Sequence, residues 1–121
     1  MTSSEVILII GAAGFGFMGI AAILVPARVA RQFEVTDLTV VGRNEVRAVY
    51  GGFGIAIAAV LIWAMLVPDL GPGICLTVAA ALGGMAIGRA CSAIMDRKVG
   101  IISILYLCLE AIGAVLIAIA A

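Results

Sequence analysis

Two ionisable side chains, Arg89 and Glu110, lie inside stretches of sequence that are otherwise apolar. A charge at the centre of a membrane-spanning helix costs roughly 2.5–3.5 kcal/mol on insertion scales, so such residues are usually paired or functional. At 1.5 Å per residue, Glu110 lies ~15 Å and Arg89 ~9 Å from the same end of two adjacent apolar stretches. An arginine side chain is long enough to bridge that difference, so the spacing predicts an interior ion pair.

Three further residues extend this pair into a predicted polar cluster of Glu45, Arg47, Tyr50, Arg89 and Glu110. One interpretation is a pocket or ion path that opens toward the basic end of the protein. The other is a structural ion pair that fixes how the helices align, because removing one member of a buried pair is costly. Glu110 is either charged and paired or protonated, since burial favours the neutral carboxyl.

The surrounding sequence is that of a membrane protein. The chain has 121 residues, of which 65% are hydrophobic and 12% are charged, whereas a soluble domain is about half apolar and a quarter charged. About 20 apolar residues cross a ~30 Å hydrocarbon layer as a helix. We therefore expect one domain, residues 1–121, forming an antiparallel bundle of four transmembrane helices over residues 4–25, 44–67, 72–95 and 99–120.

The segments that connect the four predicted helices support the antiparallel arrangement. Proline and glycine break the chain at residues 68–73, and a charged turn lies at residues 96–98, so the helices on either side should form antiparallel hairpins. The longest connection, residues 26–43, places Val29, Ala30 and Phe33 on one face of a short amphipathic helix at the membrane interface. An ordinary polar loop is the alternative there.

Small residues recur every four positions, and such stripes let membrane helices approach closely. We expect helix packing, within the chain or between copies of it, at Gly52, Ala80, Gly84, Gly88 and Ser92.

All seven lysine and arginine residues fall at or near one end of the predicted bundle, and the end with both termini has none. Because basic loops stay in the cytoplasm, both termini are predicted on the non-cytoplasmic side.

Catalytic and cofactor chemistry has little support. The chain has no histidine, its three cysteines lack metal-binding spacing, and its seven basic and seven acidic residues cancel. We therefore predict no catalytic residue, no metal, no cofactor and no nucleic-acid partner. A membrane enzyme that acts on a lipophilic substrate stays open as a lesser alternative, with Glu45, Arg47 and Tyr50 binding a polar head.

The stretch Glu45-Val46-Arg47-Ala48-Val49-Tyr50-Gly51-Gly52, with Gly88-Arg89 further on, resembles a bacterial family of small four-helix integral membrane proteins catalogued as a domain of unknown function. The resemblance covers nearly the whole chain, implies the four-helix fold and points to the same polar cluster, but it implies no chemistry. We expect the protein in the bacterial inner membrane.

Size and composition favour a non-enzymatic protein that acts through interactions. It would be an accessory subunit of a larger membrane complex or a homo-oligomer, with the lipid bilayer as its surroundings. The alternative is a small transporter or ion- or proton-conducting protein that uses Arg89 and Glu110.

Overall fold

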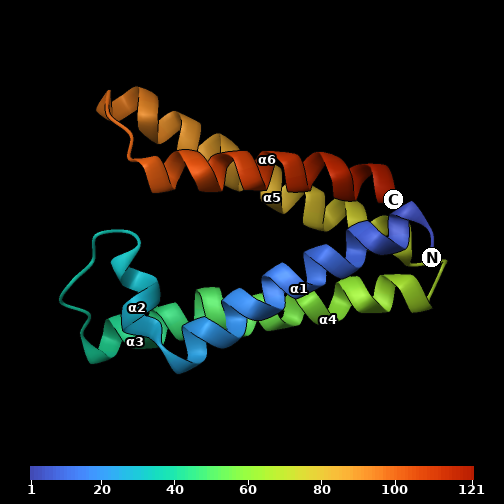
Figure 1. Cartoon of the computed structure of the whole chain (residues 1–121), viewed down its shortest axis with the longest axis horizontal. Coiled ribbons are helices and arrows are strands. Elements are labelled where there is room, and N and C mark those ends of the chain that lie inside the picture. Colours follow the sequence, from blue (N-terminus) through green and yellow to red (C-terminus); the bar gives the residue numbers. More distant parts are fainter.

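The computed structural model describes residues 1–121 and is entirely helical (Figure 1). Its elements are α1 (Ser3–Leu24), α2 (Pro26–Arg31), α3 (Val40–Val46), the π-helical segment η1 (Arg47–Gly52), α4 (Phe53–Leu66), α5 (Gly71–Asp96) and α6 (Ile101–Ala120).

Four helical stretches are long and apolar enough to cross a membrane. They are α1, the continuous stretch Val40–Leu66 made of α3, η1 and α4, and then α5 and α6. The predicted four-helix membrane fold is confirmed. The main difference is the second stretch, which begins at Val40 rather than residue 44, because the Thr39 hydroxyl accepts a hydrogen bond from the Gly42 N–H and starts the helix earlier.

The helices are arranged as two pairs, α1 with α4 and α5 with α6 (Figure 1). The pairs meet at the end that carries both termini and diverge toward the end that carries α2, α3 and the α5–α6 turn. Within an 18-residue apolar window of each stretch, only between 11% and 28% of the residues are buried within the chain. Most of the helical surface is therefore available to lipid or to a partner.

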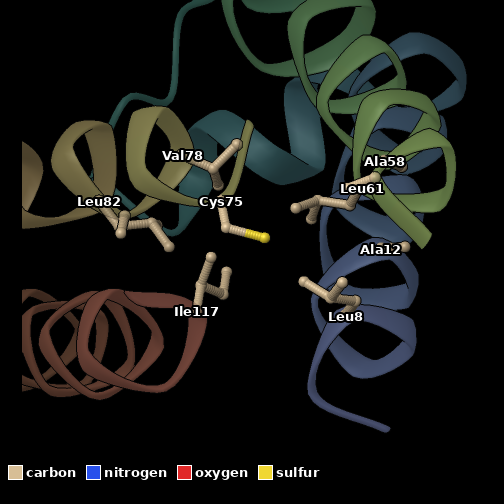
Figure 2. Packing of buried hydrophobic residues seen from close by; sticks show 10 residues of the cluster. Leu8, Ala12, Ala58, Leu61, Cys75, Val78, Leu82 and Ile117 are labelled. Atoms are coloured by element: carbon tan, nitrogen blue, oxygen red, sulfur yellow. The ribbon is translucent and has the colours of Figure 1, made fainter. Parts of the chain in front are cut away.

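The main apolar core lies where the two pairs meet. Figure 2 shows the sulfur of Cys75 on α5 directed toward Leu61 of α4, with Leu8 of α1 and Ile117 of α6 beside them. Cys75 and Leu61 are the most completely buried large side chains in the chain. This cluster joins the two pairs at one end of the bundle.

Glycine allows the closest helix contact, between α1 and the segment η1–α4. A methyl group built on Gly19 would lie 2.7 Å from the carbonyl oxygen of Gly51, and one on Gly54 would lie 2.9 Å from the carbonyl oxygen of Phe15. No real side chain tolerates such distances to backbone atoms. These glycines therefore set the distance between α1 and the second stretch.

The π-helical segment η1 interrupts the second membrane-spanning stretch with the sequence Arg-Ala-Val-Tyr-Gly-Gly. Single π-helical turns within α-helices are rare and occur frequently at functional sites. The segment presents Gly51 to α1, whereas the adjacent Gly52 is exposed.

The connection after α1 folds back onto the bundle. Val29 of α2 is buried with Ala22 of α1 and Val46 of α3, and Phe33 and Tyr50 pack against this smaller cluster. The short helix between the first two spans is thus present, and its apolar side covers the basic end of the α1–α4 pair.

Candidate functional site

Arg89 and Glu110 form a two-pronged ion pair between α5 and α6. The Nε of Arg89 donates to both carboxylate oxygens of Glu110, at 3.0 and 2.8 Å, and Nη2 donates to Oε1 at 2.8 Å. Paired, charge-assisted hydrogen bonds of this kind fix geometry as well as contributing energy. The pair therefore locks the alignment of α5 against α6.

The two helices bury this pair unequally. Glu110 lies in the middle of α6 and is only 5% exposed, whereas the Arg89 side chain is 25% exposed. The apolar surroundings strengthen the attraction between the charges, and the pairing offsets the cost of keeping each charge out of water. The acidic partner is thus enclosed, and the basic partner reaches toward the surface.

Aromatic side chains from α6, from the connection after α1 and from η1 lie beside Arg89. The guanidinium carbon of Arg89 lies 5.3 Å from the centre of the Tyr106 ring, within the range of a cation–π interaction. Phe33 lies 6.0 Å from Tyr106 and stacks on Tyr50 at 5.8 Å, measured between ring centres. Three of the chain's seven aromatic residues thus form one layer beside Arg89.

A single polar contact links the same layer to the connection after α1. The hydroxyl of Tyr106 donates to the side-chain oxygen of Gln32. Together with the Phe33 stacking, this contact bridges the two helix pairs at the end where they diverge.

A cavity of about 510 Å³ adjoins the ion pair, between the last turns of α5 and the start of α6. We call it the α5–α6 cavity. Its lining includes Arg89, Ser92, Asp96, Lys98 and Ser103. The cavity thus brings two basic groups, one carboxylate and two hydroxyls to the basic end of the bundle.

The remaining residues of the predicted polar cluster form no hydrogen bond or ion pair with Arg89 or Glu110. Arg47 donates from Nε to the carbonyl oxygen of Ile23 at 3.0 Å and so caps the last turn of α1. Glu45 is exposed and forms no hydrogen bond or ion pair with Arg89. Tyr50 belongs to the aromatic layer beside Arg89 through its stacking on Phe33, and it forms no hydrogen bond with the ion pair.

The residues predicted to pack helices are exposed in the isolated chain: Gly52, Ala80, Gly84, Gly88 and Ser92. A methyl group on Gly84 or Gly88 would have no atom within 4 Å. Ala80, Gly84, Gly88 and Ser92 lie along α5, and we call them the small-residue face. This face packs against no other helix of the chain at Gly84 or Gly88.

Sequence reasoning did not assign Gln32 and Phe33 to the site. Phe33 could have been anticipated as a packing residue, because the sequence places it on the apolar face of the segment after the first span. Nothing in the sequence points to Gln32, because its contact with Tyr106 joins residues 74 positions apart.

A family model described as a domain of unknown function, DUF4345, matches residues 3–121. The chain belongs to the DUF4345 family. No curated protein and no solved structure matches it. In this DUF4345 protein the ion pair, its aromatic cover and the adjoining cavity form the candidate site.

Proposed function

We propose that this DUF4345 protein is a non-enzymatic protein of the bacterial inner membrane that works by helix–helix association, with a second copy of itself as the partner. The observation that carries the proposal is the exposed small-residue face of α5. Lipid-facing helix surfaces have no need of small residues, whereas interfaces between membrane helices are enriched in them.

The sequence of this face is specific. Gly84-Met85-Ala86-Ile87-Gly88 is a Gly-x-x-x-Gly motif, with Ala80 and Ser92 continuing it by one turn at each end. Motifs of this type bring two identical helices into close backbone contact. Since α5 uses neither glycine for contacts within the chain, the motif is available for a second copy.

The ion pair supports an architectural role. Both carboxylate oxygens of Glu110 are hydrogen-bonded to Arg89, and the buried side-chain polar atoms of the chain all have partners. A fully satisfied pair holds α5 in a fixed position on α6. The same pair would therefore present the small-residue face in one orientation.

The test is the mass of the protein in a mild detergent. We expect a dimer for the wild type, a monomer for Gly84→Leu, and a dimer for the matched control Gly83→Leu. Gly83 lies on the same helix at the same depth, has open space at its Cβ position, and does not belong to the small-residue face.

A second readout uses a natural thiol. Cys91 is exposed on α5, three residues beyond Gly88, so oxidation should cross-link wild-type dimers through it and should fail in Cys91→Ser. A monomeric wild type that co-purifies with unrelated subunits in a fixed ratio would instead support the accessory-subunit interpretation.

A second candidate function is binding of a charged molecule, the first step in transport. The α5–α6 cavity favours it, because Arg89 lines the cavity while still holding Glu110.

A further inference from the structure

We propose that the α5–α6 cavity binds the headgroup of a zwitterionic phospholipid that carries a phosphate and a primary ammonium group, that is, phosphoethanolamine. The ligand class follows from the charges in the cavity and from the place of the cavity in the bundle. The cavity shares Gly88 and Ser92 with the small-residue face, so lipid binding is tested separately from dimerisation below.

The phosphate would be recognised by the basic side of the cavity. Arg89 uses Nε and Nη2 for Glu110, and its Nη1 forms no hydrogen bond within the chain. Lys98 lines the same cavity and forms no ion pair. An arginine N–H and a lysine ammonium are the groups that most often bind phosphate in proteins.

Uncharged hydrogen-bond donors also line the basic side of the cavity. Ser92 of α5 and Ser103 of α6, each with a hydroxyl group, also line the cavity. The start of α6 also lines it, and the capping residue Gly100 supplies no side-chain cap to the first N–H groups of that helix. Hydroxyls and free helix N–H groups are further donors for an anion.

The ammonium group would be recognised by Asp96. This carboxylate lines the cavity and forms no ion pair with Lys98 or any other residue. Glu110 neutralises the charge of Arg89, so the cavity offers no strong positive excess for a purely anionic ligand. Charges of both signs in the lining of one cavity match a headgroup that itself carries both signs.

The position of the cavity selects a lipid as the source. It extends from Met85 and Arg89 inside α5 to the end of α5 and the start of α6, where the apolar stretches end. Phospholipid headgroups begin at the edge of the hydrocarbon layer that such stretches cross. Met85, Ala93 and Val99 contribute apolar lining, which suits the glycerol and first methylene groups of a lipid. The volume, about 510 Å³, falls within the range of small-molecule sites.

The experiment is native mass spectrometry of the full chain in a mild detergent, titrated with dioleoyl phosphatidylethanolamine, phosphatidylcholine or phosphatidylglycerol. We expect wild-type protein to retain phosphatidylethanolamine most strongly. Phosphatidylcholine has the phosphate but no N–H donor, and phosphatidylglycerol has the phosphate but no cation. Comparing the three lipids therefore distinguishes recognition of the phosphate from recognition of the ammonium group.

Two variants separate the two halves of the site. Lys98→Ala should weaken the binding of all three lipids by about tenfold, since it removes a charged contact to the phosphate that they share. Asp96→Asn should weaken the binding of phosphatidylethanolamine alone, so that the protein no longer prefers this lipid to phosphatidylcholine. Arg97→Ala is the matched control, because Arg97 is exposed between these two residues and does not line the cavity.

Three outcomes would overturn the proposal. The first is equal retention of the three lipids by wild type and both variants. The second is an effect of Arg97→Ala as large as that of Lys98→Ala, which would indicate general surface charge. The third is displacement of the lipid by millimolar inorganic phosphate, which would identify a site for free phosphate. Gly84 does not line the cavity, so the Gly84→Leu variant should still retain phosphatidylethanolamine even as a monomer, and the two proposals fail separately.

Discussion

Gly19 of α1 and Gly51 of η1 lie in direct backbone contact, so that a methyl group on Gly19 would come within 2.7 Å of the Gly51 carbonyl oxygen. It would also come within 2.8 Å of the backbone nitrogen of Ile55. Neither obstacle is a flexible side chain, so the contact can be relieved only by moving one helix away from the other.

The first prediction concerns this contact. Gly19→Ala should lower the free energy of unfolding by about 1–3 kcal/mol, the usual cost of inserting a methyl group into a well-packed site. Denaturant titration of the detergent-solubilised protein measures it. Gly14→Ala is the control, because its Cβ position has open space; a loss of stability there as large as at Gly19 would contradict the explanation.

The second prediction concerns the ion pair. Glu110→Gln leaves the charge of Arg89 without its partner and should lower stability by about 3–5 kcal/mol. The double variant Arg89→Gln/Glu110→Gln removes both charges and should recover a large part of that loss. Unfolding of the single and double variants gives the coupling energy between the two residues.

Glu45→Gln is the matched control for this cycle, because Glu45 is exposed and forms no ion pair. A double variant as unstable as the sum of the two single variants would show that the two side chains act independently, contrary to the geometry.

The third prediction separates the two roles of Tyr106. Tyr106→Phe removes the hydrogen bond to Gln32 but keeps the ring beside Arg89, and should cost about 1 kcal/mol. Tyr106→Leu also removes the cation–π contact and should cost about 0.5–2 kcal/mol more. Tyr50→Phe should leave the free energy of unfolding unchanged, because the Tyr50 hydroxyl forms no hydrogen bond. Equal stability of the two Tyr106 variants would argue that the ring contributes nothing to holding Arg89.

The fourth prediction concerns orientation. Both termini lie at the end of the bundle opposite α2, α3 and the α5–α6 turn, which carry most of the basic residues (Figure 1). A reporter that is active only in the cytoplasm should therefore be silent when fused after Ala121, and one that is active only outside should function. A bright cytoplasmic reporter would reverse the proposed topology.

The sequence predicted the membrane-spanning helices well because composition and length decide them: no soluble domain of this size could bury so many apolar residues. The approach of Arg89 to Glu110 could also be anticipated, since both depths follow from the rise per residue along adjacent helices. These predictions depend on properties of single helices.

What could not be predicted depends on hydrogen-bond pattern and on contacts between distant segments. Hydropathy does not reveal that Arg47–Gly52 is π-helical, and this segment presents Gly51 rather than Gly52 to α1. Arg47 was expected near Arg89 because both lie at the same end of the bundle. Depth alone does not say which side of a helix a residue occupies, and Arg47 turns instead to the carbonyl of Ile23.

The ion pair also has a consequence for how the chain enters the bilayer during synthesis. Arg89 and Glu110 lie on consecutive helices joined by a turn of only four residues, 97–100. If α5 entered the lipid alone, it would carry an unpaired guanidinium, and α6 alone would carry an unpaired carboxylate, each of which opposes insertion. The two helices should therefore leave the insertion machinery together as a hairpin, with the charges already neutralised by each other.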